Sequence, residues 1–286
     1  MPERDAGPDH DGGLDQDLAL LVEAAYRAGR IALQFWGNNP RVHDKGDGQG
    51  PVTEADLAVN DMLETTLRAA RPGYGWLSEE TPDDPARLSC ENVFIIDPID
   101  GTRAFIDKDA GFSHSLAIAR NGHVTAAAVY LPAKDRLYTA RSRRPAHRDS
   151  APIRASQRDD PEGARLMTSK GNLDPEHWIG PPPTVQRVFR PSIASRLCLV
   201  ADGGADGLLT LRPTWEWDIA AGSLIATRAG ATVTDRHGAA PLFNRLQPQS
   251  DGLLVAPAAL HAAVLARLRP DAGFQLAQIS HGGPGV

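Results

Sequence analysis

The sequence predicts a layered α/β or α+β protein in which long helices pack against mixed strands. Residues 18–35 and 54–70 carry apolar side chains at helical spacing, so we expect two amphipathic helices there. Residues 93–96 form a short, continuous apolar run, which is typical of a buried strand. Residues 113–131 predict a hairpin, because Asn121-Gly122 separates two strand-like segments.

The second half of the chain also mixes helices and strands. Residues 196–200 suit a strand or a helix, 219–228 predict a helix that ends near Gly230, and 253–255 predict a strand followed by another helix. The 286 residues suit two domains, or one domain of two halves. We expect an acidic disordered arm, an N-terminal half with most of the metal ligands, a C-terminal half and a tail, at residues 1–17, 18–145, 160–270 and 271–286. A connector at 141–160 joins the halves.

Composition excludes several classes of protein. Hydrophobic residues make up 41% and charged residues 23%, which is an ordinary globular composition. The net charge of -6 disfavours non-specific binding to a nucleic acid polymer. The sequence lacks an apolar run of the ~18 residues that a membrane span needs, and we find no secretory signal. Cys90 and Cys198 are too few for a disulfide framework, so we expect a cytoplasmic protein with reduced thiols.

The densest chemistry lies directly after the predicted strand at 93–96. Asp97 and Asp100 stand three residues apart, with the Ile99 carbonyl between them and Gly101 permitting a tight turn. Carboxylates this close repel each other unless a proton or a cation lies between them, and such hard oxygen ligands suit Mg²⁺ or Mn²⁺. A helix that begins at Thr102 would present N–H groups to a phosphate. A structural turn or helix cap remains the alternative for this segment taken alone.

Three further acidic positions indicate a functional site only when they are considered together. Glu79-Glu80 alone would be a solvated surface pair. Asp218 alone would be an acid at a helix N-terminus, and Asp56 would cap the helix at 54–70 together with Thr53. Other chemistries fit less well, because the sequence lacks a nucleophile elbow, a dinucleotide fingerprint and zinc-ligand spacing. The arginines at 141, 143, 144 and 148 could bind anions, but a solvated connector suits them better.

Four motifs in order resemble the inositol monophosphatase superfamily of Mg²⁺-dependent, lithium-sensitive phosphatases. They are Pro51-Val52-Thr53-Glu54-Ala55-Asp56, Glu79-Glu80, Asp97-Pro98-Ile99-Asp100-Gly101-Thr102 and Trp217-Asp218-Ile219-Ala220-Ala221-Gly222. The resemblance covers roughly residues 18–268. It implies an αβαβα sandwich with the site between the two halves. The glycine-rich loop at 44–50, with Lys45, matches the mobile loop of the family.

The resemblance also implies a role for each site residue. Two or three Mg²⁺ ions, with Mn²⁺ as a possible substitute, would be held by Glu79, Asp97, the Ile99 carbonyl, Asp100 and Asp218. Backbone groups of Gly101 and Thr102 would hold the phosphate of a small-molecule ester. Thr102, with Asp56 or Glu79, would orient and deprotonate the attacking water. A homodimer is possible, since dimers are common in the family.

Within the superfamily, the chain looks most like the CysQ-type 3'(2'),5'-bisphosphate nucleotidases. The similarity lies in residues 102–106, 196–203 and 213–218. Two segments depart from that group's pattern, at 169–172 and 206–210, and both could touch a nucleotide. We expect 3'-phosphoadenosine 5'-phosphate as the substrate, with inositol 1-phosphate and histidinol phosphate as alternatives. An inactive metal- or phosphate-binding regulator is the alternative from a different class, although Glu79 and Thr102 are both present.

Overall fold

The computed structural model describes residues 8–44, 46 and 50–270. Within this part of the chain, the larger of two main sheets has seven strands. Their spatial order is β3 (Gly75–Ser78), β4 (Asn92–Asp100), β5 (Ser113–Arg120), β6 (His123–Leu131), β7 (Arg136–Arg141), β8 (His147–Arg148) and β9 (Ala151–Pro152). β3 runs parallel to β4, and every later neighbour is antiparallel.

The smaller sheet has five strands, all of them within residues 165–257. Their spatial order is β11 (Gln186–Val188), β10 (Arg165–Met167), β12 (Gly207–Thr210), β16 (Leu253–Pro257) and β14 (Ala231–Thr234). Two short ladders accompany the main sheets, β1 (Val42–Asp44) with β2 (Pro51–Thr53), and β13 (Thr214–Trp215) with β15 (Gln249–Ser250).

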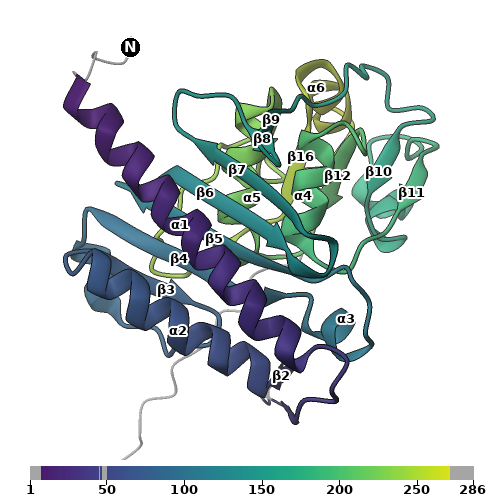
Figure 1. Cartoon of the computed structure of the whole chain (residues 1–286). Helices are drawn as coiled ribbons and strands as arrows, with labels where there is room; N and C mark the ends of the chain where they lie inside the picture. Colours follow the sequence, from purple (N-terminus) through teal and green to yellow (C-terminus); the bar gives the residue numbers. More distant parts are fainter. Residues whose placement is uncertain (1–7, 45, 47–49, 271–286) are drawn as a thin grey trace, which may run out of the picture.

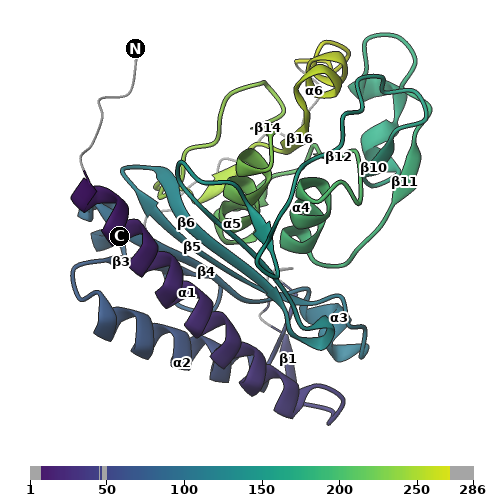
Figure 2. The same ribbon diagram turned by 45° about the horizontal axis from the view of Figure 1, so that its top comes forward.

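The helices separate and cover the sheets. They are α1 (Pro8–Phe35), α2 (Glu54–Ala70), α3 (Thr102–Ile106), α4 (Ile193–Ala201), α5 (Glu216–Arg228) and α6 (Ala258–Leu265). Short 3₁₀ segments lie at Pro85–Ser89, Pro132–Lys134, Gly171–Leu173 and Pro175–His177. α1 and α2 lie on one face of the larger sheet, and α4 and α5 lie between its other face and the smaller sheet (Figures 1 and 2). α6 covers the far face of the smaller sheet, so the predicted αβαβα sandwich is confirmed.

Strand β4 shows how the sequence produces these layers. Val93 and Ile95 face the core that contains α4 and α5, whereas Phe94 and Ile96 face the core beneath α1 and α2. Successive strand residues point to opposite faces, so a strand covered on both sides must be apolar at every position. This explains the continuous apolar run that predicted a buried strand.

Local turn and cap signals also take the predicted form. Thr53 and Asp56 form a capping box at the start of α2, where the Thr53 hydroxyl accepts from backbone N–H groups and Asp56 accepts from the Thr53 N–H. Asn121 and Gly122 both have positive φ, 49° and 81°, and connect β5 to β6.

Two expectations differ from the structure. The acidic arm was expected to extend to residue 17, but α1 begins at Pro8. Asp15 pairs with Arg141 at 2.6 Å, and Asp17 pairs with Arg71 at 2.9 Å, so these acids have partners on distant elements. Residues 12–17 are therefore part of α1, which packs on the larger sheet. Residues 1–7 and 271–286, which include the predicted tail, lie outside the described residues.

The connector at 141–160 is also more structured than expected. β8 and β9 extend the larger sheet across it. Arg141 is buried beside Asp15, and the guanidinium of Arg148 lies 2.9 Å from Asp202. These two arginines therefore have carboxylate partners within the protein, so neither an anion site nor a solvated connector describes them.

Among the described residues, the helices lack the length and apolar character that a membrane span needs.

Candidate active site

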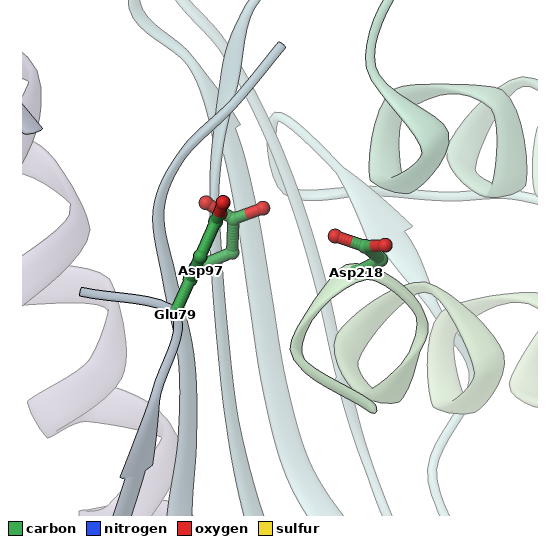
Figure 3. Close-up of side chains that lie close together, drawn as sticks. All are labelled: Glu79, Asp97 and Asp218. Atoms are coloured by element: carbon green, nitrogen blue, oxygen red, sulfur yellow. The ribbon is translucent and has the colours of Figure 1, made fainter. Parts of the chain in front are cut away.

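Three carboxylates converge from three elements at one end of the larger sheet (Figure 3). Asp97 lies near the end of β4. Glu79 directly follows β3, which pairs in parallel with β4, and its backbone N–H donates to the Ile96 carbonyl at 3.2 Å. Asp218 lies in the first turn of α5 and points back toward the sheet. The site therefore joins strands from the first half of the chain to a helix from the second.

The geometry of this cluster suits a cation. One carboxylate oxygen from each residue lies within 4.8 Å of the others. Asp97 is 1% exposed, and its Oδ1 accepts no hydrogen bond from any described residue. A buried, unpartnered carboxylate oxygen is costly unless a cation or proton compensates it. The donor set consists of hard oxygens, which Mg²⁺ prefers.

Electrostatics point to the same compensation. Burial raises the pKa of Asp97 well above its ordinary value, and the nearby carboxylates of Glu79 and Asp100 raise it further. Burial and the charge of Asp100 raise the pKa of Asp218 in the same way. Without a cation, these groups favour bound protons.

Asp100, a predicted ligand, lies beside the cluster but faces the N-terminus of α4. Its carboxylate accepts from the Ser192 hydroxyl at 2.7 Å and from the Ala194 and Ile193 N–H groups at 2.6 and 3.2 Å. Burial raises its pKa to about 6, although these hydrogen bonds oppose the shift. Asp100 thus ties the two halves together, and it would have to share its oxygens to bind a metal.

The turn after β4 brings the remaining predicted residues together. Gly101 has a φ of 97°, in the left-handed region that favours glycine, and α3 begins at the next residue. The Thr102 hydroxyl lies 3.2 Å from the Ile99 carbonyl and 3.2 Å from Asp56 Oδ1. Burial raises the pKa of Asp56 to about 6, although its hydrogen bonds with Thr53 oppose this shift. Asp56 therefore combines helix capping with contact to Thr102.

Sequence reasoning missed the roles of four residues near the cluster. Ser192 positions Asp100, and Arg196, Arg212 and Trp215 line the adjoining cavity together with Asp100 and Asp218. The Trp-Glu-Trp run directly before Asp218 was a visible signal for Trp215, but no local pattern pairs the two arginines. Lys45 and positions 47–49 of the glycine-rich loop lie outside the described residues.

Comparison with known proteins agrees with this arrangement. The family model described as the inositol monophosphatase family matches residues 14–272. An inositol-1-monophosphatase from Mesorhizobium japonicum is 32% identical over 236 residues, covering 77% of this chain and 86% of the relative. A 3'(2'),5'-bisphosphate nucleotidase CysQ from Salmonella typhimurium is 31% identical over 232 residues, covering 77% and 91%. A structure titled IMPase from Thermotoga maritima superposes with a TM-score of 0.75 at 26% identity, covering 88% and 96%.

The fold, the acidic cluster and the relatives together define a phosphatase with a layered α/β architecture that acts on phosphate esters. The chain belongs to the inositol monophosphatase family, and it is a phosphatase of that superfamily.

Proposed function

We propose that the protein is a Mg²⁺-dependent phosphomonoesterase. The observation that carries this proposal is the convergence of Glu79, Asp97 and Asp218, with a buried Asp97 oxygen that has no described partner. Asp100, whose charge acts on Asp97, and the Ile99 carbonyl, which lies 3.2 Å from the Thr102 hydroxyl, would complete the ligand set for two or three ions. Mn²⁺ could occupy the same oxygen-rich site.

The chain's own residues would divide the chemistry between them. Magnesium, when bound, would stabilise the charges that develop on the attacking and leaving oxygens. The Thr102 hydroxyl would orient the attacking water and accept a proton from it, while its own proton would go to Asp56. The Thr102 hydroxyl and Asp56 Oδ1 already lie 3.2 Å apart. Glu79 is the alternative base. The N–H groups of Gly101 and Thr102, at the start of α3, would bind phosphate oxygens.

For the substrate, we propose 3'-phosphoadenosine 5'-phosphate, which would be hydrolysed to AMP and phosphate. The 31% identity to CysQ and the similarity of residues 196–203 and 213–218 support this choice. The 32% identity to an inositol-1-monophosphatase supports inositol 1-phosphate as the alternative. Histidinol phosphate is a further candidate within the superfamily.

The test is phosphate release with Mg²⁺ from the three esters in parallel, with and without lithium. We expect hydrolysis to depend on Mg²⁺ and to be fastest with the nucleotide. Preference for another ester would leave the metal site in place and reassign the substrate. Absence of hydrolysis with every ester would favour an inactive metal- or phosphate-binding regulator. Lithium inhibition, a cytoplasmic location and a homodimer stay predictions.

A further inference from the structure

A cavity of ≈ 330 Å³ adjoins the carboxylate cluster and is lined by both acidic and basic side chains. Asp100 and Asp218 lie on one part of its lining, and Arg196 and Arg212 lie on another. The same two arginines line a second cavity, together with apolar side chains such as Met167, Val188 and Leu208. The pair therefore stands at the junction between the metal ligands and an apolar pocket.

Neighbouring residues hold the Arg196 side chain in place at this junction. Its guanidinium lies 4.9 Å from the centre of the Phe189 ring, and its side-chain nitrogens donate to the Arg190 and Pro191 carbonyls. Backbone carbonyls and an aromatic face fix its position, and the carboxylates of Asp100 and Asp218 are its nearby counter-charges. Burial lowers the pKa of Arg196, the charge of Asp100 opposes this shift, and the charge of Arg212 adds to it.

Arg212 is exposed, and it has no hydrogen bond or ion pair with any residue that the structure describes. The nearby carboxylates do not explain the pair by themselves. Asp100 takes its hydrogen bonds from Ser192, Ile193 and Ala194. Once cations compensate the acidic cluster, the two guanidinium groups that line this cavity lose their nearby counter-charges, and this arrangement suits an anion that both can bind.

We propose that Arg196 and Arg212 form a second anion subsite, which binds a phosphate or carboxylate on the leaving group of the ester. This inference rests on the proposed function, because the first anion would be the phosphate that is cleaved at the carboxylate cluster. The shared cavity lets one molecule reach both places. The subsite would make the enzyme select esters that carry two separate anionic groups.

The first experiment measures selectivity. kcat/KM is determined with Mg²⁺ for adenosine 3',5'-bisphosphate and for adenosine 3'-monophosphate, which differ only in the second phosphate. We expect Arg212→Gln to lower the ratio of the two values about tenfold or more, since a charged hydrogen bond contributes at least that much discrimination. Arg212→Lys should retain part of the ratio. An unchanged ratio in Arg212→Gln would overturn the subsite.

The matched control is Arg68→Gln, which removes an arginine from the outer face of α2, where it pairs with Glu64. It should leave the selectivity ratio at the wild-type value. Thermal melting of each variant checks that the fold is intact. Arg212 is exposed, so its replacement should cost little stability.

The second experiment does not depend on turnover. Calorimetric titration with adenosine 5'-monophosphate in Mg²⁺ should give binding about tenfold weaker for Arg212→Gln than for wild type, with adenosine as the uncharged comparison. Equal affinity of both proteins for the monophosphate would reject the subsite even in an active phosphatase. Weaker binding in the variant, combined with no hydrolysis of any ester by wild type, would reject the proposed function and retain the subsite.

Discussion

Asp97 makes the apo site unfavourable, because it is buried with other carboxylates close to it. We predict that Asp97→Asn removes part of this repulsion, so the metal-free variant should melt at a higher temperature than metal-free wild type. Turnover should fall about a hundredfold or more, because a ligand charge is lost. Asp218→Asn should behave likewise. The measurements are thermal melting in a chelator and phosphate release in Mg²⁺.

Glu23→Gln supplies the control for this prediction, since Glu23 is exposed on α1. It removes the same charge without changing the cluster. If Asp97→Asn hydrolyses ester at the wild-type rate, our assignment of the metal ligands is wrong.

Asp56 gives a prediction about pH. Its pKa is about 6, and only its deprotonated form can accept a proton from Thr102. Activity should therefore fall as the pH falls through about 6. Asp56→Asn should lower kcat about a hundredfold and remove this acidic limb from the residual activity. A pH profile of kcat at saturating Mg²⁺ tests this in both proteins, and an acidic limb that persists in the variant at the same pH would exclude Asp56 as the base.

The sequence supported different parts of the site to different degrees. Asp97 follows the predicted strand at 93–96, and the motif order brought in Glu79 and Asp218. The orientation of Asp100 could not be predicted, because its partners lie about ninety residues away at Ser192–Ala194. Neither could the pairing of Arg196 with Arg212, which depends on how α4 and the segment after β12 pack.

At the scale of elements, the packing of α1 on β6 depends on a small residue. A Cβ added at Gly29 would lie 2.5 Å from Tyr130 Cε1 and 3.0 Å from Pro132 Cβ. We predict that Gly29→Ala destabilises the protein by about 1–3 kcal/mol, because overpacking exceeds the gain in helix propensity. Chemical denaturation of the variant and wild type measures the difference.

The same helix offers a matched control. A Cβ added at Gly13 meets no atom within 4 Å. Gly13→Ala should therefore raise the free energy of unfolding by about 0.5–1 kcal/mol, since alanine favours a helix over glycine. If both alanines stabilise the protein, the close approach of α1 to β6 is not a constraint.

Elements with local signals could be predicted, and elements with distant partners could not. The hairpin at Asn121-Gly122 and the cap at Thr53 depend on residues within a few positions of each other. The early start of α1 depends on Arg71 and Arg141, which attract Asp17 and Asp15 from later parts of the chain. An acidic N-terminal segment gives no sign of such partners by itself.

At the scale of the whole molecule, the carboxylate cluster joins the two halves of the sandwich. Asp97 lies in the larger sheet, Glu79 directly follows its strand β3, and Asp218 comes from α5, which packs between the sheets. Mg²⁺ bound here would bind the folded state alone, because unfolding separates these ligands. Metal binding should therefore raise global stability, by about 2.7 kcal/mol when the free ion is about 100 times its Kd.

The effect of Mg²⁺ on stability should depend on pH. The pKa values of Asp97 and Asp218 are raised in the folded state, so protons stabilise the metal-free fold at acidic pH. This contribution is complete below the unfolded-state pKa of about 3.9 and is lost as the pH rises through the folded-state values. We predict that the melting temperature in a chelator falls as the pH rises from about 4 through the raised pKa values of these two carboxylates. The increment from Mg²⁺ should grow over the same interval, because the ion competes with fewer protons. Thermal scans with and without Mg²⁺ at several pH values measure both the fall in melting temperature and the growth of the Mg²⁺ increment. Asp97→Asn should make both depend less on pH. A Mg²⁺ increment that is equal at every pH would mean that the ion binds away from these carboxylates.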